Sequence, residues 1–183
     1  KSDAIYDYIT QNITYDYDGL KAEDTDNYEY TPYAALINKT AVCQGYAMLY
    51  YRLAEEVGLD SRVVTGKSFG ENHAWNIVRM ADVYDVSAYY YLDSTWDAGK
   101  EYYDYYLKGV FDFYDHDGSD WFDLPENKKY SIWQYGPFIP DFEATSGDYE
   151  YLVKDDVAYI TKYNGTEEDV VIPNRLDKYP VHY

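Results

Sequence analysis

Three residues of this sequence are of the types that carry out nucleophilic acyl transfer. Cys43 is the only cysteine of the chain, and His73 and Asp93 follow it in that order. A thiolate attacks carbonyl carbons, an imidazole transfers the protons, and a carboxylate keeps the imidazole aligned. The three together predict attack on a carbonyl group through a thioester.

The thiol is expected to lie at the start of a helix. Gly58 ends an apolar stripe with alternating steps of four and three residues, formed by Cys43, Ala47, Tyr50, Ala54 and Val57. The first turn of a helix exposes backbone N–H groups and the positive end of the macrodipole. This position favours the thiolate form of a cysteine side chain.

The histidine and the aspartate fall at the ends of predicted strands. Three β-type segments, 62–65, 74–80 and 89–92, are separated by glycines and by a turn region at 82–87. His73 opens the second segment and Asp93 closes the third, so neighbouring antiparallel strands would bring the two side chains together. With a further helix over 2–13 and an acidic surface loop over 15–30, the pattern predicts an α+β fold.

Each of these residues alone has a more common structural role. A single cysteine on an apolar helix stripe usually packs as a small hydrophobe, and a histidine at a strand end usually bonds a loop carbonyl. Asp93 alone would be a turn or cap residue, and Asp97 in the same Ser-Thr-Trp-Asp run is a rival for the orienting role. The conjunction of the three types is what favours catalysis.

Local sequence strengthens this interpretation. The blocks are Ala-Val-Cys-Gln-Gly-Tyr-Ala at 41–47, His-Ala-Trp-Asn-Ile-Val at 73–78 and Tyr-Leu-Asp-Ser-Thr-Trp-Asp at 91–97. Together they resemble the transglutaminase-like superfamily in its bacterial form, and the resemblance extends over roughly residues 1 to 100. It implies a papain-like α+β core with Cys43 as nucleophile, His73 as base and Asp93 as the orienting residue.

The resemblance implies acyl transfer on peptide or carboxamide bonds. Hydrolysis, by a peptidase or amidase, is the preferred outcome because the cross-linking members of animals are much larger and calcium-activated. Protein-glutamine gamma-glutamyltransferase cross-linking is one alternative. A surface adhesion or binding module on the same scaffold, with Cys43 as a relic, is another.

The oxyanion of the tetrahedral intermediate needs hydrogen-bond donors. The backbone N–H of Cys43 is the natural first donor, because the start of a helix leaves it unpaired. Asn38, Gln44 and Tyr17 are candidates for a side-chain donor, and the sequence does not choose among them.

Composition restricts the partners. With 15 Lys and Arg against 34 Asp and Glu among 183 residues, the net charge is −19, which argues against binding of nucleic acid. Twenty-seven tyrosines would suit a peptide or protein substrate, and acidic aromatic walls favour a cationic or sugar-bearing peptide such as a cell-wall peptide. No apolar run approaches the length that crosses a bilayer, so membrane insertion is not expected. The protein is expected to be a monomer.

Neither a metal nor a cofactor is predicted. One cysteine cannot form an intramolecular disulfide or a cysteine zinc site. The acidic stretch 115–120 suggests a calcium loop, but Phe113 and Leu124 occupy positions at which an EF-hand needs oxygen ligands. A solvated acidic loop is favoured instead.

A domain boundary is predicted near Gly147, between a catalytic domain over 1–147 and a small β segment over 148–183. The segment has strand candidates at 149–153, 157–163 and 169–172. It resembles the opening unit of the leucine-rich-repeat arrays of bacterial surface proteins; a small β appendage is the alternative. The repeat interpretation predicts an extracellular or cell-surface location in a bacterium, although the first residues lack the features of a signal peptide.

Overall fold

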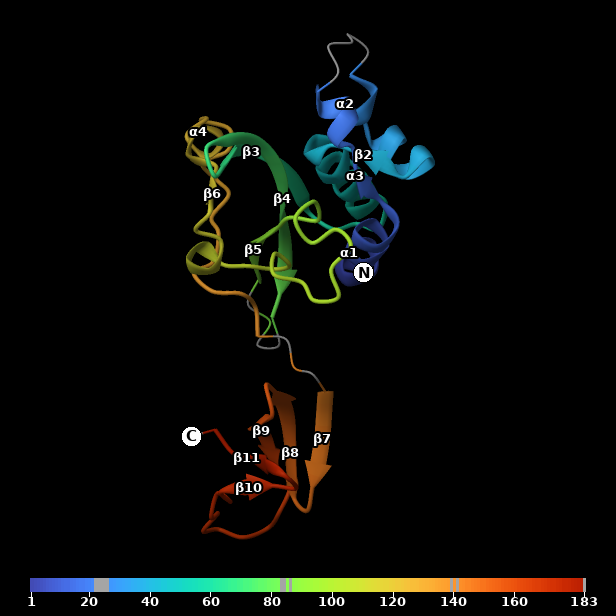
Figure 1. Ribbon diagram of the computed structural model, residues 1–183. Coiled ribbons are helices and arrows are strands. Elements are labelled where there is room, and N and C mark those ends of the chain that lie inside the picture. The colour runs from blue at the N-terminus through green and yellow to red at the C-terminus, as the bar shows by residue number, and fades with distance from the viewer. Residues whose placement is uncertain (22–26, 83–84, 86, 139, 141, 183) are drawn as a thin grey trace. The chain divides into compact units, whose positions relative to one another are not determined.

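The computed structural model describes residues 1–21, 27–82, 85, 87–138, 140 and 142–182. The chain divides into two units: Lys1–Ala81 with Asp85–Pro137, and Asp82–Tyr84 with Phe138–Tyr183 (Figure 1). The three candidate residues Cys43, His73 and Asp93 all lie in the first unit.

Two long helices form where the apolar spacing predicts them. They are α1 (Ser2–Asn12) and α3 (Cys43–Glu56), which pack against each other. Each buries one stripe, with Tyr6 and Ile9 inside on α1 and Tyr46 and Tyr50 inside on α3. Gly58, at φ +76, follows the last turn of α3, as expected for a residue that ends a helix in the left-handed region.

The four-stranded sheet of the first unit is antiparallel throughout. It contains β3 (Ser61–Ser68), β4 (Glu71–Ala81), β5 (Ser87–Leu92) and β6 (His116–Asp117), in the order β5-β4-β3-β6. Three of these strands correspond to the predicted β segments, and α3 packs on β4. The predicted α+β class is confirmed.

Two hydrophobic clusters enclose this sheet. The first joins α1 and α3 to Val78, Tyr90 and Leu92, while the second joins Val64 and Ile77 to aromatic residues after position 104. Alternation of side chains along β4 and β5 supplies both clusters from the same strands. The sheet is therefore covered on both faces, which fixes the strand ends that carry the candidate site.

Short elements connect α1 to α3. They are β1 (Thr14–Tyr15), α2 (Tyr17–Lys21), the 3-10 turn η1 (Tyr28–Tyr30), the π-helical turn η2 (Ala34–Asn38) and β2 (Thr40–Ala41). β1 pairs in parallel with β2. The prediction of a plain surface loop over 15–30 is therefore wrong at both ends, and its middle, 22–26, lies outside the described residues. The parallel pair brings the start of this segment beside the start of α3.

The segment after β5 is mostly irregular, as the sequence predicts, but one piece of it joins the sheet. η3 (Val110–Asp112) and α4 (Ser119–Phe122) flank β6, which pairs with the end of β3. A Cβ atom at Gly66 would lie 2.1 Å from the carbonyl oxygen of Asp117. Glycine at position 66 is thus what allows β6, and His116 with it, to approach β3.

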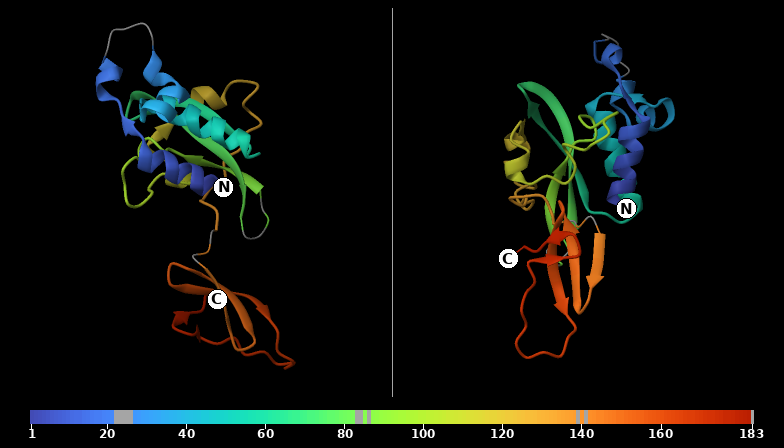
Figure 2. Two further views of the ribbon diagram at one scale, coloured as in Figure 1. Left: turned by 90° about the vertical axis from the view of Figure 1, so that its right-hand side faces the viewer. Right: turned by 60° about the horizontal axis from the view of Figure 1, so that its bottom comes forward.

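The second unit is a three-stranded antiparallel sheet with a short hairpin. The sheet consists of β7 (Phe142–Ser146), β8 (Tyr149–Lys154) and β9 (Val157–Tyr163), and the hairpin of β10 (Arg175–Leu176) and β11 (Tyr179–Pro180) (Figure 2). The main segment of this unit starts at Phe138, about ten residues before the predicted boundary. Gly147, at φ +58, lies inside the unit, in the turn between β7 and β8.

The tail departs from the predicted strands in one place. The predicted strand over 169–172 is absent from the described structure, and Val171 is 81% exposed. The unit has a small core of its own, formed by Tyr151, Val153, Ala158, Leu176 and Val181. The leucine-rich-repeat resemblance stays a prediction.

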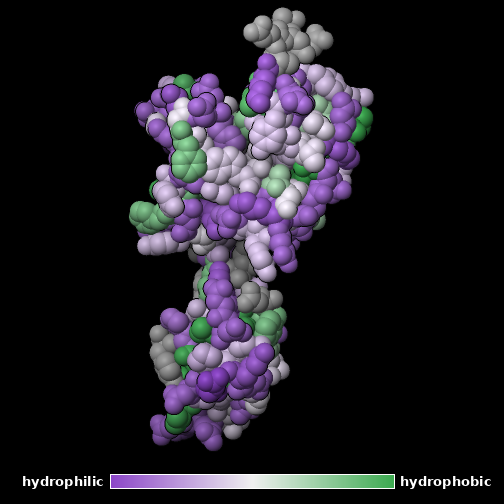
Figure 3. All heavy atoms as spheres, in the orientation of Figure 1, coloured by the Kyte–Doolittle hydropathy of each residue, from purple (hydrophilic) through white to green (hydrophobic). Residues whose placement is uncertain are grey.

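Surface polarity agrees with the charge of the sequence. On the face shown in Figure 3, hydrophilic side chains predominate and hydrophobic ones form separate small patches. Among the described residues, none of the helices has the length and apolar character that a bilayer span requires.

Candidate active site

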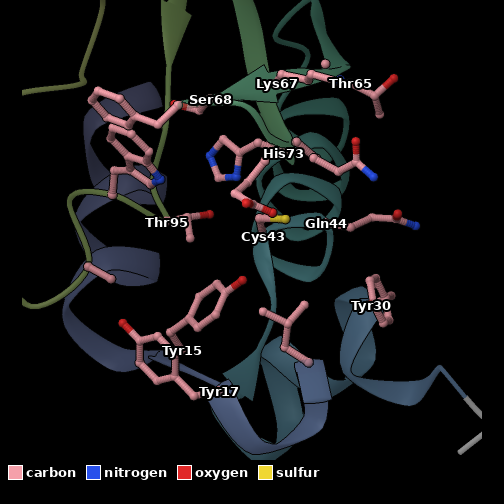
Figure 4. Close-up of a pocket in the computed structure, with 18 of the residues that line it drawn as sticks. Tyr15, Tyr17, Tyr30, Cys43, Gln44, Thr65, Lys67, Ser68, His73 and Thr95 are labelled. Carbon is pink, nitrogen blue, oxygen red and sulfur yellow. The ribbon is translucent and has the colours of Figure 1, made fainter. Parts of the chain in front are cut away.

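Cys43 is the first residue of α3. Val42 before it is extended, and its N–H donates to the carbonyl of Glu29, which fixes the chain as it enters the helix. Gly45, two residues into the helix, faces Ala41 and the carbonyl of Glu29 so closely that a Cβ atom would collide with both. The thiol is partly exposed and lines a cleft, where a substrate carbonyl can reach it (Figure 4).

His73, in β4, faces this thiol. Its Nε2 lies 2.6 Å from Oδ2 of Asp93, and its side chain is 8% exposed. Burial alone would lower the pKa of His73, but the hydrogen bond to Asp93 and the neighbouring Cys43 thiol raise it to about 10. At neutral pH the imidazole is therefore protonated, which places a positive charge beside the sulfur.

Asp93 directly follows β5 and is buried. Its Oδ1 accepts from the N–H groups of Thr95 at 2.9 Å and Trp96 at 3.3 Å, which leaves Oδ2 for imidazoles. Burial would raise the pKa of Asp93, but hydrogen bonds from His116 and His73 lower it to about 2. The carboxylate is ionised and has a fixed orientation.

Asp97, the rival for the orienting role, serves the packing of the first unit instead. Its carboxylate accepts from the hydroxyl of Tyr6 at 2.7 Å and from the N–H groups of Asp104 and Tyr105 at 2.9 and 2.8 Å. Burial raises the pKa of Asp97 despite these hydrogen bonds. Among the two aspartates, only Asp93 has a hydrogen bond to His73.

His116 is a fourth member of the site that the sequence analysis missed. Its Nε2 lies 3.1 Å from Oδ2 of Asp93, and its Nδ1 lies 2.7 Å from Oδ1 of Asp115. The only available signal is that one of three histidines stands inside the acidic run 115–120, for which the sequence favours a solvated loop. That prediction is wrong at Asp115 and His116, whose side chains are 11% and 0% exposed because they bond each other and Asp93. The pairing of β6 with β3, which brings His116 here, spans two residues and leaves no periodic pattern.

His73, Asp93 and His116 are also the residue types that bind transition metals. Their ligand atoms lie within 4.8 Å of one another. However, the two imidazole nitrogens lie 2.6 and 3.1 Å from the same carboxylate oxygen, which are the distances of direct hydrogen bonds. A zinc ion between these atoms would need bonds of about 2.0 to 2.2 Å to each. The observed distances therefore fit hydrogen bonds between the two imidazoles and Asp93 better than they fit coordination of a metal ion.

Tyr15, in β1, is better placed than the predicted side-chain donors to assist at the thiol. Its hydroxyl points toward Cys43 and interacts with the backbone of that residue (Figure 4). Burial and the nearby thiol raise the pKa of Tyr15 to about 12, so the phenol keeps its proton. Gln44 and Tyr17 line the cleft, whereas Asn38 is exposed on η2 and is not among the described lining residues.

The cleft in front of Cys43 has a volume of about 1610 Å³. Its lining is rich in aromatic rings and carries charges of both signs, with Lys67, Glu71 and Asp120. At one wall the ring of Phe69, 79% exposed, stacks on Trp96 with centroids 5.3 Å apart and planes 5° apart. Phe69 has φ +48 at the turn between β3 and β4. A bulky residue in this strained conformation points to a role at the cleft.

The helix that starts at the thiol, the antiparallel sheet and the loop after β5 together define a papain-type α+β fold. The model of the transglutaminase-like superfamily matches residues 1–98, just over half of the chain. The chain belongs to this superfamily, and the predicted resemblance is confirmed at that level.

Two curated relatives are similar over part of the chain. The kyphoscoliosis peptidases of Mus musculus and Homo sapiens are each 32% identical to it over 108 residues, which is 52% of this chain and 15% of each relative. A crystal structure of a TGase matches with a TM-score of 0.43 and 25% identity, over 51% of this chain and 25% of that one. The chain thus spans a small part of the length of these relatives.

Proposed function

We propose that this protein is a cysteine-dependent acyl-transfer enzyme that hydrolyses peptide or carboxamide bonds, with Cys43, His73 and Asp93 as its catalytic triad. The observation that carries the proposal is the contact of the accessible Cys43 thiol with an imidazole that is hydrogen-bonded at 2.6 Å to a buried carboxylate. Thiolate next to imidazolium is the reactive form of a cysteine nucleophile.

The reaction follows from this arrangement. The thiolate of Cys43 forms a bond to the carbonyl carbon, and the electron pair of the C=O bond moves to the oxygen. His73 then gives its proton to the leaving nitrogen as the C–N bond breaks, which leaves a thioester and a neutral imidazole. Water attacks the thioester and loses a proton to His73, and the acid departs as the thiolate re-forms. If an amine replaces water, the same steps join two chains.

The fraction of the thioester that reacts with water, compared with the fraction that reacts with an amine, is measurable. We expect a mixed library of peptides and glutamine donors, incubated with a labelled primary amine, to yield more hydrolysis products than amine adducts. A majority of amine adducts would assign the chain to cross-linking instead. Absence of both products, together with a Cys43 no more reactive toward iodoacetamide than free cysteine, would favour the binding-module alternative.

Tyr15 is expected to stabilise the oxyanion together with the N–H of Cys43. Substitution Tyr15→Phe removes the hydroxyl and keeps the ring, so kcat should fall by about 100-fold with little change in KM, as for loss of one oxyanion donor. Tyr33→Phe is the matched control, because Tyr33 is 58% exposed and is not among the described residues of the cleft lining. Equal kcat values for the two variants would remove Tyr15 from the mechanism.

Phe69 is expected to contribute to substrate binding. Its ring, exposed beside Trp96, offers a surface on which apolar, sugar or cationic groups of a peptide gain contact. Substitution Phe69→Ala should raise KM by about 3- to 10-fold at nearly constant kcat, as for loss of an aromatic contact. Phe111→Ala, which removes a similarly exposed ring outside the described cleft lining, should leave both constants unchanged.

A further inference from the structure

His116 makes two hydrogen bonds to carboxylates from a fully buried side chain. Nδ1 lies 2.7 Å from Asp115 and Nε2 lies 3.1 Å from Asp93, and the side chain has 0% exposure. Each ring nitrogen of His116 thus faces a carboxylate oxygen at hydrogen-bond distance. His116 is held at both ends of its ring.

Aromatic rings fix the plane of this imidazole. Phe113 stacks on it with ring centroids 3.9 Å apart. The rings of Trp75, Trp96 and Tyr105 also pack against it, with centroids at 5.0, 4.9 and 5.5 Å. Tyr105 also donates from its hydroxyl to the second oxygen of Asp115, at 2.6 Å. The partner that anchors His116 is therefore itself held in place.

Asp93 accepts from both histidines on a single oxygen atom. His73 lies at 2.6 Å from Oδ2 and His116 at 3.1 Å, while the backbone occupies Oδ1. Among the described residues, the charged or titratable groups that face Asp93 are these two imidazoles and the phenols of Tyr6 and Tyr105. Those that face His116 are Asp93, Asp115, His73 and Tyr105. His116 and His73 therefore compete for the same negatively charged oxygen of Asp93.

We infer that His116 is a positioning residue for the proposed reaction, which fixes Asp93 and limits how strongly this carboxylate binds the proton of His73. Two effects follow. The carboxylate is kept in the orientation that aligns His73 with Cys43, and the imidazolium of His73 gives up its proton more readily to a leaving amine than it would beside an unshared carboxylate.

Substitution His116→Phe tests this inference, which rests on the proposed function for its kinetic readout. Phenylalanine keeps a ring among the neighbouring rings but removes both hydrogen bonds. We expect kcat to fall by about 10- to 100-fold, as for a lost hydrogen bond to a charged group. KM should stay the same, because His116 is not among the described residues that line the cleft. His116→Gln, whose amide can still donate to Asp93, should recover part of kcat.

A second readout does not depend on turnover. The chain has three histidines, so NMR titration of imidazole-labelled protein resolves them with few variants. In His116→Phe the titration midpoint of His73 should move to higher pH, because a competing donor to Asp93 is lost. His182→Phe, which alters the histidine of the second unit, should leave both the midpoint of His73 and kcat unchanged.

The outcomes separate the inference from the proposed function. An inactive wild-type protein in which His116→Phe still moves the His73 titration would contradict the proposed function and keep the coupling between the histidines. An active His116→Phe variant with unchanged kcat and unchanged His73 titration would overturn the inference alone. A fall in kcat that His116→Gln does not recover, with an unmoved titration, would show a packing role only and would also overturn it. If His116→Phe does not fold, His116→Gln carries both measurements, with smaller shifts in the same directions expected.

Discussion

Substitution Cys43→Ala is expected to lower kcat/KM by at least about 10⁴-fold, because it removes the atom that forms the thioester. Iodoacetamide should modify the wild-type protein once near neutral pH, faster than it modifies free cysteine, and should leave the variant unmodified. Cys43 is the only thiol of the chain, so intact mass measures this reaction directly.

The control for Cys43→Ala is its thermal stability. The thiol is partly exposed, so its removal should leave Tm nearly unchanged. Residual hydrolysis above one hundredth of the wild-type rate in a folded Cys43→Ala variant would show that another group performs the reaction. An unchanged affinity for a peptide ligand in the same variant would separate binding from chemistry.

Substitution Asp93→Asn should lower kcat by about 10³- to 10⁴-fold, because an NH2 group in place of Oδ2 cannot accept the hydrogen bond from His73 and the imidazole loses its alignment. Loss of one partner from a buried ionic pair should also lower the free energy of unfolding by about 3 kcal/mol. Steady-state kinetics and urea unfolding measure the two effects.

The stability effect of Asp93→Asn should depend on pH. The pKa of Asp93 is lowered to about 2, so its contribution to stability is present above its ordinary value of 3.8 and is lost as the pH falls through about 2. The pKa of His73 is raised to about 10, so its contribution is present below 6.5 and is lost as the pH rises through about 10. The difference between wild type and variant should be largest between about pH 4 and pH 6.5.

Asp97→Asn is the matched control for this substitution. Asp97 is as buried as Asp93 and lies in the same loop, but it bonds Tyr6 and backbone N–H groups instead of an imidazole. We expect Asp97→Asn to lower stability while kcat of the folded variant stays within a few-fold of wild type. A loss of kcat as large as in Asp93→Asn would mean that the whole loop, and not the carboxylate of Asp93, sets the rate.

The main elements and the positions of three candidate site residues were predictable because each has a local signal. The apolar stripe of α3 and the β segments appear in short windows of sequence, and Cys43, His73 and Asp93 fall at their ends. The contact of His73 with Asp93 needed only the expected pairing of neighbouring strands.

Residues that depend on long-range contacts were not predictable. His116 reaches Asp93 through a two-residue strand in an irregular segment, and nothing in the spacing marks it. The candidate donor Tyr17 is two residues from Tyr15, and the choice between them depends on the pairing of β1 with β2. The sequence predicts a domain boundary near Gly147, which instead lies in a tight hairpin turn, because such turns and the links between domains use the same residue types.

The loop after β5 uses one residue for two purposes. The N–H of Trp96 helps to hold Asp93, and its ring stacks on Phe69, at the tip of the β3–β4 turn, in one wall of the cleft. A substitution of Trp96 that reshapes this wall therefore also disturbs the carboxylate of Asp93, which belongs to the proposed triad. Phe69, which stacks on Trp96, makes no such contact with Asp93. We therefore expect changes in substrate preference to evolve by substitution of Phe69, while Trp96 stays invariant. The two stacked residues of a single cleft wall would then diverge at unequal rates.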